Sequence, residues 1–268
     1  MGILNVTPDS FSDGSESETL EQVLVRAAEM VKAGADILDI GGESTRPGAE
    51  PVSESQELMR VLPVIRALRT AWPKLPLSID TYKAGVAAAA IGIGADMVND
   101  VWGLAHGLDP ATAAVSPMAA TVARLGCPVV LMHNRTNRHY GDFWEDLLGD
   151  LRASVARARQ AGVAEHQIWL DPGFGFAKDV PHNLEVIKHL QRVVHLGYPV
   201  LVGTSRKSTI GKVLNRTVEN RLDGTAASVV WAIQQGARMI RVHDVAAVRP
   251  FVQMADAIAA GLNFEHHG

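Results

Sequence analysis

The sequence predicts an α/β fold of the TIM (β/α)8 barrel type, as a single domain over residues 1–268. The chain has 268 residues, which is close to the roughly 250 that one such barrel needs. Short apolar runs alternate with amphipathic stretches along the whole chain, as they do in successive βα units. Nearly continuous apolar strands are typical of parallel sheets covered on both faces. A doubly wound open sheet is the alternative, but no GxGxxG follows the first strand to favour it.

Eight strands are predicted at short runs rich in valine, isoleucine and leucine. In chain order they are Gly2–Asn5, Ile37–Ile40, Leu77–Asp80, Met97–Asn99, Val129–His133, Ile168–Asp171, Val200–Gly203 and Met239–Val242. Three of them follow similar segments, KAGADILDI, GIGADMVND and QQGARMIRV. In each, a glycine stands where a left-handed residue can end the preceding helix.

Helices are predicted between these strands from apolar residues spaced three and four apart. The first stripe consists of Leu20, Val23, Leu24, Ala27, Ala28 and Val31. Two helices have capping boxes at their starts, because Thr19 precedes Gln22 and Ser53 precedes Gln56 by three residues. Pro181 suits the first turn of another helix. The segment from Gly103 to Cys127 is longer than a usual connection, so the bounds of its helix stay open.

Composition excludes several classes of protein. The net charge is −4 and both signs are spread along the chain, so we expect no nucleic-acid partner and no membrane partner. No apolar run is long enough to span a bilayer, and the start does not resemble a signal peptide. The single cysteine, Cys127, excludes a disulfide framework and is expected to be a buried thiol. We therefore expect a soluble, cytoplasmic protein.

Polar side chains stand at the ends of nearly all the predicted strands, where a TIM barrel carries its chemistry. They are Asn5, Asp39, Asp80, Asn99, His133, Asp171, Arg241 and His243. A lone aspartate here is more often a loop or cap residue, but the whole set indicates one polar rim. Carboxylates and amides together suit a small, nitrogen-rich ligand, because they accept from and donate to its hydrogen-bonding edges.

An anion site is predicted after the seventh and eighth strands. The segment GTSRKSTIG contains Ser205, Arg206, Lys207 and Ser208, and RVHD follows in the eighth strand. Barrels commonly bind phosphate with these two loops. For Arg206 we favour a surface ion pair. The opening loops NVTPDSFSDGSES and GGESTRPGAEP are long enough to close over a charged substrate.

Eight segments, in order, resemble the dihydropteroate synthases of folate biosynthesis, and the resemblance covers essentially the whole chain. They are GILNVTPDSFSDG, DIGGESTRPGA, SIDTYKA, GADMVNDVWG, VVLMHN, DPGFGFAK, GTSRKS and RVHDV. The resemblance implies a TIM barrel that transfers a pterinylmethyl group. Its substrates would be 6-hydroxymethyl-7,8-dihydropterin diphosphate and p-aminobenzoate, and its products 7,8-dihydropteroate and diphosphate.

The same resemblance implies roles for individual residues. The residues expected to be catalytic are Asp80, Asp171, Lys207, Arg241 and His243. Of these, Asp80, Asp171 and Lys207 would bind the pterin together with Asn99, and Arg241 would stack on its ring. Asn5 would bind Mg²⁺, the implied cofactor, near the diphosphate held by Arg241 and His243. The residues expected around p-aminobenzoate are Thr45, Arg46, Phe11, Phe176, Lys207 and Ser208.

The implied mechanism breaks the C–O bond first, so that diphosphate leaves and the pterin ring spreads the positive charge before the arylamine attacks. No covalent protein nucleophile is needed. Members of this family are often homodimers and are targets of sulfonamides, which mimic p-aminobenzoate. Trp231 or the last helix is a candidate for the dimer interface.

Three other functions remain open from the residues alone. Lys207 near a strand end is compatible with a Schiff-base aldolase, although Asp80 and Asp171 are expected to keep it protonated. A pterin-binding methyltransferase has a similar set of Asp and Asn residues but lacks the SRKS and STRPG loops. A pterin-binding protein without catalytic activity is the third.

Overall fold

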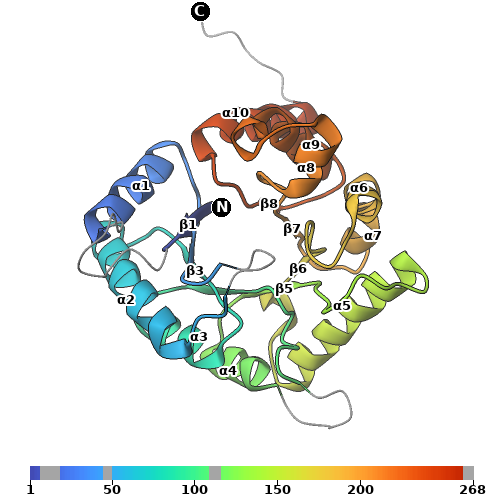
Figure 1. The fold of residues 1–268 in the computed structure, drawn as a ribbon. Coiled ribbons are helices and arrows are strands. Elements are labelled where there is room, and N and C mark those ends of the chain that lie inside the picture. The colour runs from blue at the N-terminus through green and yellow to red at the C-terminus, as the bar shows by residue number, and fades with distance from the viewer. Residues whose placement is uncertain (7–18, 45–49, 109–115, 262–268) are drawn as a thin grey trace, which may run out of the picture.

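The computed structural model describes residues 1–6, 19–44, 50–108 and 116–261. Within them, helices surround a central cylinder of strands (Figure 1). The strands are β1 Gly2–Asn5, β2 Leu38–Gly41, β3 Leu77–Asp80, β4 Met97–Asp100, β5 Val129–Met132, β6 Ile168–Asp171, β7 Leu201–Val202 and β8 Met239–Ile240. All eight predicted strands are present, and their ends differ from the prediction by at most two residues.

The strands close into one barrel. β1 to β6 pair in sequence order and in parallel, and β7 pairs with β8. Single bridges join β1 to β8 at Gly2 and Val242 and β6 to β7 at Leu170 and Val200. At the first junction the Ile3 amide donates to the Val242 carbonyl oxygen at 2.9 Å. This closed, sequential order confirms the TIM barrel, because a doubly wound sheet would place later strands on both sides of the first.

The barrel interior changes from apolar to polar along the strands. Met97, Val130 and Leu201 form a buried apolar cluster, against which Trp169 and Met239 pack. Three of these residues, Met97, Trp169 and Met239, are each followed two positions later by a polar residue. The polar residues are Asn99, Asp171 and Arg241. Alternate residues of a strand share a face, so the same inward face carries packing residues first and polar groups at the carboxyl end.

In the part of the chain that the structure describes, eight helices form the outer ring: α1 Leu20–Lys32, α2 Glu54–Ala71, α3 Ala84–Gly92, α4 Pro117–Leu125, α5 Phe143–Gln160, α6 Val180–Lys188, α9 Leu222–Gln234 and α10 Val245–Ala260. Two short helices lie between them, α7 Gln191–Val194 and α8 Ser208–Leu214. The side chains facing out from the barrel, such as Leu38, Ile40 and Leu77, pack against this ring and are fully buried.

The predicted helix signals are confirmed. Both capping boxes form, with Thr19 and Gln22 at the start of α1 and with Ser53 and Gln56 at the start of α2. Pro181 lies in the first turn of α6. The glycines after α1, α3 and α9 have left-handed φ angles of 88°, 117° and 100° at Gly34, Gly94 and Gly236. In the long segment before β5, the helix begins at Pro117, behind the capping side chain of Ser116.

Cys127 is buried, as expected, and burial raises the pKa of its thiol. Among the helices of the described ranges, none combines the length and the apolar character needed to cross a bilayer.

Candidate active site

The carboxyl ends of the first four strands meet in one row. The strand register places Asn5 beside Gly41, Gly41 beside Asp80, and Asp80 beside Asn99. A side chain at Gly41 would begin 3.6 Å from Asn5 Oδ1 and 3.7 Å from Asp80 Oδ2. Glycine therefore leaves a gap that Asn5 and Asp80 flank, and the predicted metal ligand lies next to a predicted pterin ligand.

Arg241 crosses the barrel mouth from β8 and joins two carboxylates. Its Nε donates to Asp39 Oδ2 at 2.6 Å, and its Nη2 donates to Asp80 Oδ2 at 2.7 Å. Asp39 also accepts from Asn99 Nδ2 at 3.1 Å. Burial lowers the pKa of the guanidinium, but the two carboxylates more than offset this and the net pKa is raised. The arginine therefore stays charged, and Asp39 orients both Arg241 and Asn99 from below.

The two predicted pterin carboxylates are held at raised pKa values. Burial raises the pKa of Asp171 to about 6, against the opposing effects of the Gly173 amide, Lys207 and Lys178. Burial also raises the pKa of Asp80; Arg241 opposes this shift, and the negative charge of Asp39 adds to it. Within the described ranges, Asp80 Oδ1 is buried and has no hydrogen-bond partner. It is therefore an acceptor available to the N–H group of a ligand.

The loop after β6 brings Phe176 and Lys207 together. Gly173 donates its amide to Asp171 Oδ1 at 2.7 Å, and Lys207 Nζ lies 4.1 Å from the centroid of the Phe176 ring. Gly175 has a φ of 86°, and a side chain there would begin 2.8 Å from Lys207 Cδ. Only glycine permits both this left-handed turn and this close approach of Lys207.

The anion-binding residues predicted after β7 and β8 separate into two groups. His243 Nδ1 lies 3.0 Å from Ser205 Oγ, which also accepts from the His243 amide at 3.2 Å. Arg206 instead forms an exposed ion pair with Asp244, through its Nε at 2.8 Å. The expectation of a surface pair for Arg206 is confirmed. Ser208 is the exposed first residue of α8.

Among the described rim residues, Asn5 is the predicted ligand for a metal ion. Among the described residues, no group of three or more His, Cys, Asp and Glu side chains is placed to hold one. The amide oxygen of Asn5 is a hard donor of the kind that Mg²⁺ accepts, and this ion usually keeps waters and substrate phosphates as its other ligands. The donor set fits an ion that arrives with a diphosphate.

Three predicted binding residues, Phe11, Thr45 and Arg46, lie outside the described ranges. Conversely, several residues at the rim had no predicted role. Asp39 and His133 were recognised only as polar strand ends, and Ser205 only as a hydroxyl in the anion loop. Lys178 had no signal beyond its place in the DPGFGFAK segment. Their roles depend on partners distant in sequence, which spacing alone does not reveal.

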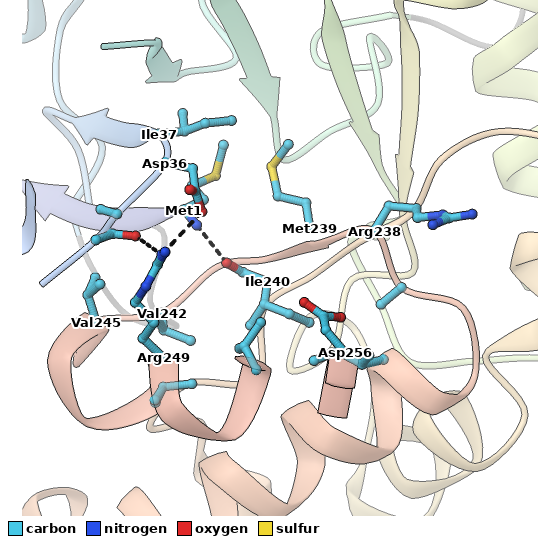
Figure 2. A pocket seen from close by; sticks show the side chains of 16 residues that line it. Met1, Asp36, Ile37, Arg238, Met239, Ile240, Val242, Val245, Arg249 and Asp256 are labelled. Atoms are coloured by element: carbon cyan, nitrogen blue, oxygen red, sulfur yellow. Dashed lines mark hydrogen bonds and ion pairs between the residues drawn. The ribbon is translucent and has the colours of Figure 1, made fainter. Parts of the chain in front are cut away.

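A cavity of about 370 Å³ lies at the opposite end of the barrel. Figure 2 shows its wall, in which Met1 and Met239 stand at the starts of β1 and β8, and Arg249 of α10 pairs with Asp36 at 3.7 Å. It faces the ends where the strands begin. In TIM barrels that face supports stability, whereas catalysis occurs at the other.

The fold and the rim together define a TIM-barrel protein whose polar mouth suits a small, nitrogen-rich, anionic ligand. Comparison with known proteins gives the family. The model of the pterin-binding enzyme family matches residues 1–243. The dihydropteroate synthase of Bacillus subtilis is 50% identical over the whole chain and 90% of the relative's length, and that of Clostridium beijerinckii is 47% identical over 96% and 93%.

Solved structures agree with these relatives. A Clostridium difficile dihydropteroate synthase, determined in the presence of pteroic acid, superposes with a TM-score of 0.89 at 46% identity, over 96% of this chain and 95% of that one. A Yersinia pestis dihydropteroate synthase in a sulfonamide complex gives 0.87 at 40% identity, over 97% and 93%. The chain belongs to the dihydropteroate synthase family of pterin-binding enzymes, which join 6-hydroxymethyl-7,8-dihydropterin diphosphate to p-aminobenzoate.

Proposed function

We propose that the rim residues carry out the dihydropteroate synthase reaction in defined roles, beginning with pterin recognition. Asp171 and Asp80 accept from the N–H groups of the aminopyrimidinone edge, and Asn99 pairs with the adjacent ring atoms. The unpaired, buried Asp80 Oδ1 supports this role, because a pterin N–H would satisfy it. A ligand without these groups would leave buried acceptors unpaired, which is a strong source of selectivity.

Arg241 and His243 stabilise the leaving diphosphate. Two nitrogen atoms of Arg241 donate to Asp39 and Asp80. With the guanidinium held in this way, its flat face stacks on the pterin ring and its remaining nitrogen donates to the diphosphate. His243 is oriented through Ser205. A Mg²⁺ ion, when bound, would offset the negative charge that develops on the diphosphate, and Asn5 is the residue that would hold it.

The reaction begins with cleavage of the bond between the pterin methylene carbon and the diphosphate oxygen. The electron pair leaves with the oxygen, and the electron-rich ring spreads the resulting positive charge. The amine of p-aminobenzoate then attacks the methylene carbon and afterwards loses a proton. The carboxylates of Asp80 and Asp171 face the cationic ring, so they stabilise it electrostatically.

The arylamine binds on the side of the rim formed by Phe176 and Lys207. The 4.1 Å contact between Lys207 Nζ and the Phe176 ring supports this placement, since it puts an apolar wall beside a cation that attracts the benzoate carboxylate. Ser208 starts the helix next to it. Phe11, Thr45 and Arg46 are proposed to complete the pocket from the two opening loops. Sulfonamides are expected to compete here, as the drug complex of the Yersinia pestis relative suggests.

The observation that carries this assignment is the bridge by which Arg241 joins Asp39 and Asp80 across the barrel mouth. The direct test mixes both substrates with Mg²⁺ and measures diphosphate and dihydropteroate. We expect product only with p-aminobenzoate, and a loss of at least about a hundredfold in kcat/KM for Asp171→Ala and Lys207→Ala. The exposed residues Asp223 and Lys212 supply matched alanine controls.

Full turnover in both site variants would refute the residue roles. Absence of diphosphate release by the unmodified chain would instead favour a pterin-binding protein without catalysis. Borohydride trapping of a carbonyl substrate on Lys207 would favour the aldolase alternative. Chelation of Mg²⁺ should abolish the reaction, and added Mg²⁺ should restore it.

We also propose that residues 1–268 form one pterin-binding domain in the cytoplasm and that two copies associate through α9 and α10. These helices pack on each other and carry exposed apolar side chains, with Trp231 51% exposed and Phe251, Met254 and Ile258 45%, 62% and 66% exposed. Met254→Lys should give a monomer in sedimentation. Val25→Lys on α1, at a position 58% exposed, is the control. A monomeric unmodified chain would contradict the proposal.

A further inference from the structure

Lys178 is a buried lysine near the end of the loop that joins β6 to α6. It is only 4% exposed. Its Nζ lies 2.9 Å from His133 Nδ1 and 3.1 Å from each of the carbonyl oxygens of Gly173 and Phe176. A lysine ammonium has three N–H donors, and three acceptors surround it here. The charged form therefore satisfies the whole arrangement.

The histidine in this arrangement is set by partners on its other side. His133 Nε2 lies 3.1 Å from Asp150 Oδ2, and Asp150 accepts from Arg135 Nε at 2.5 Å. Burial lowers the pKa of His133 to about 4, so its ring is neutral near pH 7. The proton then belongs on Nε2, facing the carboxylate, and the lone pair of Nδ1 faces Lys178.

The loop itself needs this support. Gly173, Gly175 and Ala177 have φ angles of 69°, 86° and 47°, a left-handed alternation that is unfavourable for alanine. Such backbone does not form the regular ladders that usually satisfy carbonyl groups. The Lys178 ammonium donates to two of these carbonyl oxygens, those of Gly173 and Phe176. Tyr140 donates to the carbonyl oxygen of Ala177 at 2.9 Å.

We propose that Lys178 is a positioning residue: its ammonium ties the loop after β6 into the shape that holds Phe176 beside Lys207, and so sets the affinity for the arylamine. The inference rests on the proposed function, because it takes Phe176 as the wall of the p-aminobenzoate pocket. Lys178 contacts the backbone of this wall and acts through it.

The charges around Lys178 make the support dependent on pH. Burial lowers the pKa of Lys178 to about 7; Asp171 and Asp150 oppose this shift, and Arg135 and Lys207 add to it. A neutral amine has two N–H donors and cannot serve three acceptors. As pH rises through about 7, Lys178 therefore loses one of its three hydrogen bonds, and the loop is held less firmly.

Global stability should respond to pH in the opposite direction. The unfolded chain keeps its proton to a higher pH than the folded one, so deprotonation of Lys178 relieves the cost of burying a charge and raises the free energy of unfolding. A purely structural lysine would give only this effect. Falling arylamine affinity together with rising stability is the signature of the positioning role.

The test compares Lys178→Met with the unmodified enzyme, with Lys188→Met on α6 as the control, since Lys188 is 62% exposed. Below pH 7 we expect KM for p-aminobenzoate to rise about tenfold in Lys178→Met, as for the loss of a charged hydrogen bond. The ratio of the two KM values should shrink as pH rises from about 6 to about 8.5. Dividing by the variant at each pH cancels titration of the substrates.

A double-mutant cycle identifies the route. If Lys178 acts through the aromatic wall, its effect on KM for p-aminobenzoate should largely disappear in a Phe176→Ala background. The inference would be overturned if Lys178→Met raised KM by the same factor with and without the Phe176 ring. A KM ratio that does not change with pH would also overturn it. If the unmodified enzyme forms no dihydropteroate at all, the proposed function fails instead.

Two His133 variants keep the proposal testable if Lys178→Met does not fold. Asn places its amide oxygen near the position of Nδ1, whereas Gln reaches toward that of Nε2. His133→Asn preserves the acceptor for Lys178 and should raise KM for p-aminobenzoate less than His133→Gln does. The reverse order would contradict the role of the Lys178 ammonium.

Discussion

At the scale of single residues, the rim depends on side chains that serve other side chains. Asp39 is fully buried beneath Asn99 and Arg241 and accepts from both. The sequence predicted polar groups at the strand ends because the strands there were clear. It did not predict which group orients which, because Asp39 and Arg241 are 202 residues apart.

Replacing Asp39 by Asn should weaken pterin binding without removing any ligand contact. The variant retains the shape but loses the charge that holds Arg241, and hydrogen bonds to charged groups contribute about 1.5–3 kcal/mol. We therefore expect the Kd for a pterin to rise at least about tenfold, measured by calorimetry.

Asp36→Asn is the matched control for this experiment. Asp36 lies at the opposite end of the barrel, with a side chain that is 82% exposed. Equal pterin affinity in Asp39→Asn and the unmodified enzyme would show that Arg241 and Asn99 do not need Asp39.

Asp171 gives a prediction for pH. Its folded-state pKa is raised to about 6, and in the proposed role the ionised form accepts two ligand N–H groups. Affinity for a pterin without the diphosphate should therefore fall from about pH 7 to about pH 5. Asp171→Asn should bind weakly, with a smaller change across this range that comes from Asp80, whose pKa burial raises to about 7. A pH dependence as large as that of the unmodified enzyme would contradict the assignment.

The same shift has a consequence for stability. Between the ordinary pKa and about 6 the folded state binds more protons than the unfolded one, so the free energy of unfolding falls as pH rises through that range. Asp171→Asn is thus expected to be more stable at pH 7 while it binds the pterin less well.

At the scale of elements, local chemistry and structure agree. The capping boxes, the proline in the first turn of α6 and the left-handed glycines after α1, α3 and α9 were all predicted, because each signal needs only a few adjacent residues. The loop after β6 was recognised for its glycines. The link to Lys178 was not predicted, since the acceptor His133 directly follows β5, a different strand.

Thr19→Ala should destabilise the fold by about 1 kcal/mol, as for other lost N-caps. Thr19 accepts from the Gln22 amide and starts α1. Denaturant unfolding would measure the change. The control is Thr70→Ala, whose hydroxyl donates to the Arg66 carbonyl oxygen within α2; it should change stability by less than about 0.5 kcal/mol. Similar values for both would exclude a capping contribution.

At the scale of the molecule, closure of the barrel positions the site. The bridges at Gly2 and Val242 and at Leu170 and Val200 bring β7 and β8 into the cylinder, which places Lys207 and Arg241 over the same mouth as Asp80 and Asp171. The apolar cluster of Met97, Val130 and Leu201 fills the interior below them. The rim is therefore supported by a packed core.

Leu201→Ala should cost about 2–5 kcal/mol, because it leaves a cavity inside the barrel. Leu201 is fully buried, whereas Leu184 on α6 is 48% exposed. Leu184→Ala should stay within about 0.5 kcal/mol in the same unfolding experiment. A small loss for Leu201→Ala would mean that the interior can collapse around the missing side chain.

The sequence by itself determined the (β/α)8 order, the helix ends, the polar strand ends and the resemblance to dihydropteroate synthases. These follow from periodicity and short-range chemistry, which neighbouring residues carry. Only the tertiary structure decided which groups pair: Asp39 with Arg241 and Asn99, His243 with Ser205, Arg206 with Asp244, and Lys178 with His133. Hydrogen bonds and charge interactions act over a few ångströms in space, and only the pairing of the strands and the closure of the barrel bring these distant residues within that range.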